Sequence, residues 1–115
     1  MKDKDLINES AIAISNQFGL EKVPDELGDR QQQYEALKKL LSERIMDMID
    51  HEFDRFVNLL YRIDISESKV KQALSEQPFS KGVEKVADMI IQRQMQKVAT
   101  RKQYSSQRDD LEFDI

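Results

Sequence analysis

The sequence predicts an all-α protein, a bundle of about four helices with a long second helix. Apolar residues recur at steps of three and four over most of the chain, which places them on single helix faces. Only three Gly and two Pro interrupt 115 residues, of which 35% are charged, a composition typical of helices with wide solvated faces. The length fits one domain, expected over residues 1–104, with a frayed or disordered acidic tail over residues 105–115.

The first helix is expected over residues 5–18. Four apolar residues share one of its faces, namely Ile7, Ala11, Ile14 and Phe18. Gly19 follows at the position where a positive φ ends a helix at low cost. The linker 20–28 contains three apolar residues that we expect to attach it to the core, namely Leu20, Val23 and Leu27.

The second helix is predicted to start at Asp29, which forms a capping-box pattern with Gln32. The apolar steps then continue to Ile63, and no Gly or Pro occurs within residues 30–62. A continuous helix of this length would extend for roughly 50 Å. Because average helices are about a third as long, a bend or break near Asp50 is the alternative.

A break is expected at residues 63–66, where either Asp64 or Ser66 caps a short third helix that runs to about Glu76. We expect Asp64 in the capping role, and Arg62 either beside the last carbonyls of the preceding helix or paired with an acid. Pro78 ends the third helix. Ser80 then caps a fourth helix, which runs to about Gln103 or Tyr104.

Two stretches carry a resemblance to a known group. The first runs from Phe53-Asp54-Arg55-Phe56 through Leu59-Leu60-Tyr61-Arg62-Ile63-Asp64-Ile65-Ser66-Glu67. The second runs from Ile90-Ile91-Gln92-Arg93-Gln94 through Gln96-Lys97, with Thr100-Arg101 and Tyr104. Over roughly residues 35–104 the chain resembles small bacterial helical proteins of unknown function. The resemblance implies a soluble helical fold and no established activity, and it transfers no catalytic residue.

Few residues here suit catalysis or metal binding. The chain has no Cys and one His, so thiolate chemistry is excluded. Asp47, His51 and Asp54 follow one another at steps of four and three, a workable spacing for metal ligands. However, they lie off the apolar stripe, and no Glu-x-x-His motif of a di-metal bundle occurs. We therefore expect solvated side chains, no metal, no cofactor, no catalytic residue and no enzymatic activity.

Charge is distributed unevenly along the chain. Residues 81–108 carry seven Lys or Arg against two acids, within a chain of net charge −4. The candidate surface consists of five cations, namely Arg93, Lys97, Arg101, Lys102 and Arg108. Such a stripe can bind phosphates of a nucleic acid. The favoured interpretation is intramolecular or solvated, because cations near a helix C-terminus suit the helix dipole and pair with nearby acids.

The last seven residues alternate acids with the apolar residues Leu111, Phe113 and Ile115. This pattern suits a peptide that docks in a groove with a basic rim. A frayed end that only aids solubility is the simpler interpretation. A third is that the tail folds back onto the basic helix that precedes it, because their charges are opposite.

Together these observations favour a non-enzymatic cytoplasmic protein that acts in protein–protein interaction or scaffolding. A homo-oligomer, with a dimer favoured, is expected because the short helices cannot cover a roughly 50 Å stripe alone. The alternative function is nucleic-acid binding through residues 81–108. No secretory signal and no membrane-spanning segment is expected, since apolar runs are only a few residues long.

Overall fold

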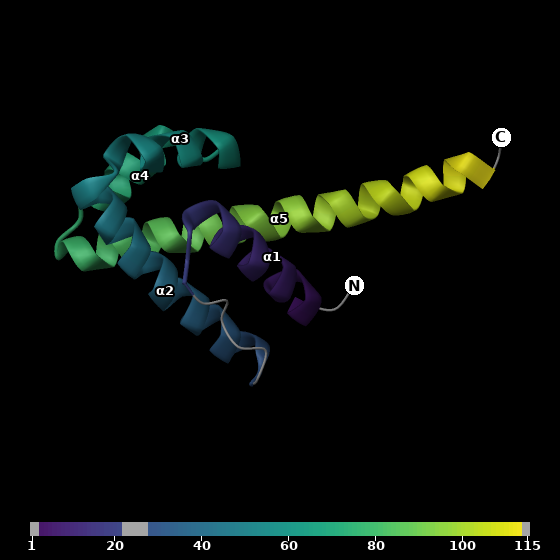
Figure 1. Ribbon diagram of the computed structural model, residues 1–115, viewed down its shortest axis with the longest axis horizontal. Coiled ribbons are helices and arrows are strands. Elements are labelled where there is room, and N and C mark those ends of the chain that lie inside the picture. Colours follow the sequence, from purple (N-terminus) through teal and green to yellow (C-terminus); the bar gives the residue numbers. More distant parts are fainter. Residues whose placement is uncertain (1–2, 22–27, 114–115) are drawn as a thin grey trace.

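The computed structural model describes the backbone of residues 3–21 and 28–113 and the surroundings of side chains in residues 6–21 and 28–103. These residues form five helices and no strand: α1 (Asp3–Phe18), α2 (Arg30–His51), α3 (Phe53–Ile63), α4 (Glu67–Leu74) and α5 (Phe79–Phe113). The all-α class is confirmed, with five helices in place of about four. Helix α5 runs along the long axis, and the other four pack around its first part (Figure 1).

The chain breaks at Glu52, so a continuous second helix is wrong and the alternative, a break near Asp50, is confirmed. Glu52 has φ −140° and ψ 50°, which are not helical angles, so α2 ends here. Its N–H still donates to the Met48 carbonyl. The Glu52 carboxylate accepts from Arg55 at 3.1 Å and from Arg44 at 2.9 Å, so two arginines hold the corner. These hydrogen bonds, with Arg55 contributing most, lower the pKa of Glu52 below its ordinary value.

The break allows α3 to turn away from the line of α2 and pack on the rest of the same chain. Four residues of α3 are buried in this way, namely Phe56, Leu59, Leu60 and Ile63. The longest helix is therefore α5, with 35 residues, and not the second. The length of the apolar stripe in α2 and α3 consequently no longer favours a second copy.

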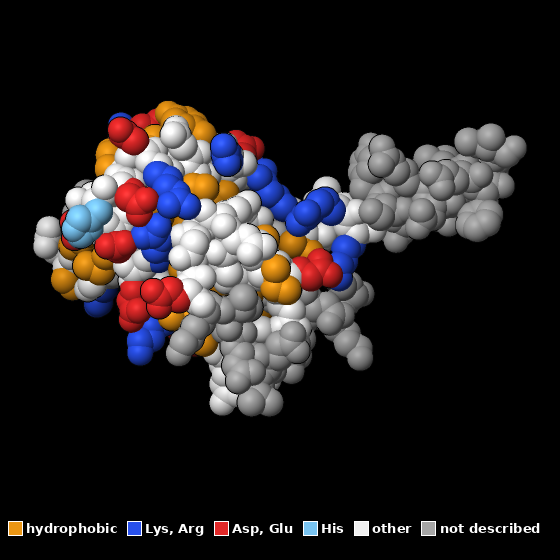
Figure 2. All heavy atoms as spheres, viewed as in Figure 1, with side chains coloured by type: hydrophobic (Ala, Val, Ile, Leu, Met, Phe, Trp, Pro, Cys, Tyr) orange, Lys and Arg blue, Asp and Glu red, His pale blue; other side chains and the backbone are white. Residues whose placement is uncertain are grey.

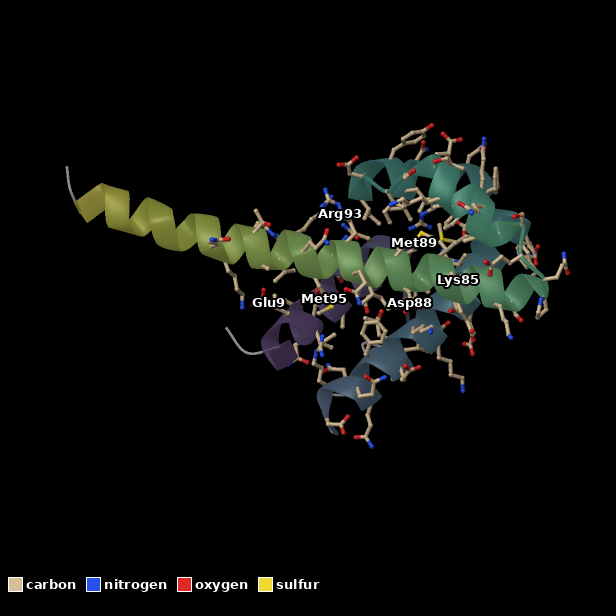
Figure 3. All side chains as sticks on the ribbon, turned by 180° about the vertical axis from the view of Figure 1, so that it is seen from behind. Glu9, Lys85, Asp88, Met89, Arg93 and Met95 are labelled. Carbon is tan, nitrogen blue, oxygen red and sulfur yellow. The ribbon has the colours of Figure 1, made fainter. Side chains whose placement is uncertain are left out.

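Helix α5 is the centre of the core and contacts each of the other helices. Its buried apolar face follows the predicted stripe, namely Val83, Val86, Ala87, Ile90, Ile91, Met95 and Val98. Gly82 sits where α4 crosses α5 most closely, because a Cβ at this position would lie 2.1 Å from the Ala73 carbonyl oxygen. Figure 3 shows Asp88 on the side of α5 that faces α2, and Met89 and Arg93 on the side that faces α3 and α4.

Helix ends follow local chemistry in most places. The Asp29 and Gln32 capping box of α2 is confirmed in both directions. Gly19 has φ +68° directly after α1, as predicted. At the next corner, Ser66 caps α4 by accepting from the Lys69 N–H. Asp64 instead ends α3 in the left-handed region, so the expectation that it caps the following helix is wrong.

The boundaries of the later helices also differ from expectation. Helix α4 ends at Leu74 rather than near Glu76, and α5 starts at Phe79, one residue before Ser80. Helix α5 continues to Phe113 instead of ending near residue 104. No Gly or Pro follows Gly82, so no residue type after it stops a helix by its own backbone preference. Leu20 packs on the core, whereas Val23 and Leu27 lie outside the described residues.

Candidate functional site

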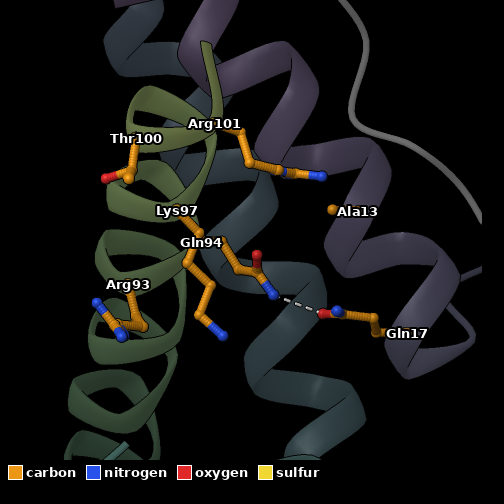
Figure 4. A pocket seen from close by; sticks show the side chains of 7 residues that line it. All are labelled: Ala13, Gln17, Arg93, Gln94, Lys97, Thr100 and Arg101. Atoms are coloured by element: carbon orange, nitrogen blue, oxygen red, sulfur yellow. Dashed lines mark hydrogen bonds between the residues drawn. The ribbon is translucent and has the colours of Figure 1, made fainter. Parts of the chain in front are cut away.

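A groove between α1 and α5 brings part of the predicted cationic surface together. It has a volume of about 520 Å³ and seven lining residues, namely Ala13, Gln17, Arg93, Gln94, Lys97, Thr100 and Arg101. We call it the cationic groove; Figure 4 shows its side chains. Three of the five predicted cations line it, and none of its described lining residues is acidic.

Two of these cations contact the C-terminal end of α3. Arg93 lies 3.2 Å from the Asp64 carboxylate and donates to the Ile63 carbonyl at 3.3 Å. Lys97 donates to the Arg62 carbonyl at 3.1 Å. Positive charge at a helix C-terminus is stabilising, because the last carbonyls have no partner within the helix. This geometry agrees with the intramolecular interpretation for Arg93 and Lys97.

Arg101 differs from its two neighbours on α5. Its side chain is exposed and points across the groove toward Ala13 of α1 (Figure 4). Within residues 6–21 and 28–103, Arg101 has no hydrogen bond or ion pair. Its guanidinium N–H groups face solvent and lie in the same groove as two further cations. They are therefore available to an anionic ligand.

The remaining predicted residues lie elsewhere. Lys102 pairs with Glu9 of α1 at 2.7 Å and does not line the groove. The side chains of Arg108, Leu111 and Phe113 lie outside the described residues, as does Ile115. Figure 2 shows Lys and Arg side chains in a row that leads toward the emerging part of α5.

The sequence prediction missed the contribution of α1 to this groove. The Gln94 side chain is 3% exposed and donates to Gln17 of α1 at 2.6 Å, which forms a polar floor. A signal was present, because Gln94 falls among the apolar residues Ile91, Met95 and Val98 on the buried face of α5. A polar side chain in such a stripe indicates a partner on a facing element.

A second groove, which is apolar, lies between α3 and α4. It has a volume of about 80 Å³ and includes Phe56, Val57, Leu60, Ile65, Val70 and Leu74. Phe53 and Tyr61 flank it and are 54% and 64% exposed, respectively. The Tyr61 hydroxyl donates to Glu67 at 3.2 Å across the rim. We call this surface the apolar groove; hydrophobic side chains are visible along that edge of the molecule in Figure 2.

The candidate metal ligands do not form one cluster. Asp47 accepts from Arg44 at 2.6 Å and lies 3.2 Å from His51. Asp54 belongs to α3, after the break that ends the helical spacing of the other two. Among the residues that the structure describes, no group of three or more His, Cys, Asp or Glu side chains is arranged to hold a metal ion.

A polar network on the other side of α5 joins it to α2. The Tyr34 hydroxyl donates to Asp88 at 2.7 Å and accepts from Gln92 at 3.2 Å. Lys38 completes the network at 3.2 Å from Asp88. Burial and the Asp88 hydrogen bond raise the pKa of Tyr34 to about 12. This network stabilises the contact between α2 and α5. None of its four residues lines the cationic or the apolar groove.

No protein-family model, curated protein or solved structure matches this chain. In the part of the chain that is described, no helix combines the length and the apolar character needed to cross a membrane.

Proposed function

We propose that this protein is a non-enzymatic protein-interaction module that binds its partner in the apolar groove. The observation that carries the proposal is the exposure of Phe53 and Tyr61, two aromatic residues that line an apolar depression. Exposed apolar surface of this kind is unfavourable in water and is typical of interaction sites. Tyr and other aromatic residues contribute disproportionately to the binding energy of such sites.

The shape of the apolar groove indicates the partner's chemistry. Two helices form its walls, and its volume of about 80 Å³ accommodates only one or two apolar side chains. Its charged rim residues, Glu67 and Lys71, already pair with each other at 3.5 Å, so the rim has no excess of either charge. These features suit the apolar face of an amphipathic helix, which would place its anchors between Phe53 and Tyr61.

Nucleic-acid binding through the cationic groove is the second candidate, and Arg101 is the observation that favours it. The exposed guanidinium is available to a phosphate. However, Arg93 and Lys97 already contact the end of α3, and Lys102 pairs with Glu9. Because fewer cations remain to neutralise phosphates, we favour the apolar groove.

A comparative capture experiment tests the proposal. The tagged full chain would be incubated with lysate of its source, with and without nuclease, and retained proteins identified by mass spectrometry. The groove variant combines Phe53→Ser with Tyr61→Ser, and the matched control is Ile12→Ser, an apolar residue on α1 that is 48% exposed. We expect a discrete protein that survives nuclease and is lost only from the groove variant.

The captured protein would then be purified and titrated against each variant. We expect its dissociation constant to rise more than tenfold in the groove variant, since each aromatic anchor contributes about 2 kcal/mol. The Ile12→Ser control should match the wild type. Equal binding by the groove variant contradicts the proposal. Loss of all bound material after nuclease would favour the nucleic-acid candidate.

A further inference from the structure

We propose that the cationic groove of one copy binds residues 109–115, the acidic last residues of α5 and the two that follow them in the sequence, from a second copy. The two chains would then form a reciprocal pair in which their α5 helices run antiparallel. This inference goes beyond the proposed function and concerns a different surface. It assigns an occupant to the cationic groove and a role to the acidic residues.

The cationic groove and residues 109–115 carry opposite charges. Residues 109–115 contain four acids and no cation, namely Asp109, Asp110, Glu112 and Asp114. Among the described side chains, the cationic groove is lined by three cations and no acid. Asp64, which is 83% exposed, pairs with Arg93, while Lys97 and Arg101 form no ion pair with a carboxylate within residues 6–21 and 28–103. The groove and the acidic segment are therefore electrostatically complementary.

The cationic groove and the acidic segment of the same chain cannot meet each other. Helix α5 is continuous from Phe79 to Phe113, so the cations and acids lie on one rod. Asp109 is about 12 Å further along the axis than Arg101, at 1.5 Å per residue. The end of α5 also projects beyond the other helices (Figure 1). A fold-back of the tail onto its own helix, one of the sequence-based interpretations, is incompatible with this helix through Phe113.

An antiparallel pair places an acidic segment in the cationic groove of both copies at once. If Arg101 of one chain lies level with Asp109 or Asp110 of the other, the two-fold axis passes near residue 105. Each groove then receives the acidic end of its partner, and the assembly closes as a dimer. The opposite wall of the groove includes the small residue Ala13, so a third helix can approach α1 closely.

The pair should be sensitive to salt, because its ion pairs are largely exposed to solvent. Sedimentation velocity of the full chain over a concentration series at low and high salt would measure the dissociation constant. Arg101→Glu changes the cationic groove, and the tail variant combines Asp109→Lys with Asp110→Lys. Lys81→Glu is the matched control, an equal reversal at an exposed position near the other end of α5.

We expect a wild-type dimer at low salt that dissociates at high salt. Arg101→Glu and the tail variant should each dimerise at least tenfold more weakly, while Lys81→Glu should match the wild type. An equimolar mixture of the two variants should dimerise more tightly than either alone, because a mixed dimer contains one native groove–tail contact and one with both charges reversed.

Three results would overturn the inference: a monomeric wild type at low salt, a dimer that neither reversal weakens, or a mixture no tighter than its components. Circular dichroism of every variant establishes that the helical fold is retained. The Phe53→Ser and Tyr61→Ser variant should dimerise as the wild type does. Failure of the apolar-groove proposal is therefore distinguishable from failure of this one.

Discussion

At the scale of single residues, the Tyr34 hydroxyl forms a polar contact between two helices beside the core. It bridges α2 and α5 by donating to Asp88 at 2.7 Å. The side chain is half-buried, so water replaces this hydrogen bond only in part when it is lost. The contact therefore contributes to stability, and it depends on the protonation of the hydroxyl.

We expect Tyr34→Phe to lower the free energy of unfolding by about 1 kcal/mol at neutral pH. Urea denaturation measures the change, and Tyr61→Phe is the matched control, because that hydroxyl bonds at 3.2 Å on an exposed residue. The control should lose less than Tyr34→Phe does. Equal losses would show that the Asp88 contact has no special weight.

The pH dependence follows from the same residue. The pKa of Tyr34 rises from 10.0 to about 12 on folding, so the unfolded chain releases this proton first. Deprotonation then favours the unfolded state, and the contribution of Tyr34 is present at neutral pH and lost as the pH rises through this interval. The Tyr34→Phe variant should show a smaller loss of stability there than the wild type.

Residue-scale predictions succeeded where the interaction is local. The Asp29–Gln32 capping box and the positive φ of Gly19 depend on neighbours within a few positions, which the sequence displays directly. The roles of Arg93 and Lys97 depend on carbonyls 30 and 35 residues away. No periodic pattern reveals such a distant partner, so only the general tendency of cations to suit a helix C-terminus could be predicted.

At the scale of elements, the break at Glu52 explains why the helix count was wrong. Apolar steps of three and four continue across it through Ile49, Phe53 and Phe56, so the stripe alone cannot distinguish one helix from two. Phe53 is the member that the break leaves 54% exposed. The same residue became a flank of the apolar groove, which the sequence did not predict because the stripe was assigned wholly to the core.

The crossing of α4 and α5 yields a prediction for Gly82. In an unobstructed helix, Gly→Ala gains up to about 1 kcal/mol of helix propensity. Here the added methyl would lie 2.1 Å from the Ala73 carbonyl oxygen, and backbone must move to admit it. We expect Gly82→Ala to destabilise the fold by about 1–3 kcal/mol. Urea denaturation checks this against Lys81→Ala, and a more stable Gly82→Ala protein would contradict it.

At the scale of the whole molecule, the all-α class could be predicted because apolar period, sparse Gly and Pro and charged faces all agree. The arrangement around α5 could not, since it depends on where α2 breaks. The molecule measures 55 × 32 × 22 Å, and α5 follows the longest dimension. Helix α5 contacts every other helix, so a substitution on its buried face should lower the stability of the whole fold.

We expect Ile91→Ala to cost about 2–5 kcal/mol, because Ile91 is fully buried on α5. Ile12→Ala, at a residue 48% exposed, should change stability by less than about 0.5 kcal/mol. Thermal or urea unfolding followed by circular dichroism and by tyrosine fluorescence would report both values. Separate transitions for the two probes would contradict a single core organised by α5.

Helix α3 lines the apolar groove and contacts two cations of the cationic groove. One of its faces lines the apolar groove with Phe56 and Leu60, while its last carbonyls are held by Arg93 and Lys97 of the cationic groove. A partner that shifts α3 would therefore alter the position of these two cations. Such sites are thermodynamically linked, and the coupling is reciprocal: whatever factor one occupant imposes on the affinity of the other, it receives in return.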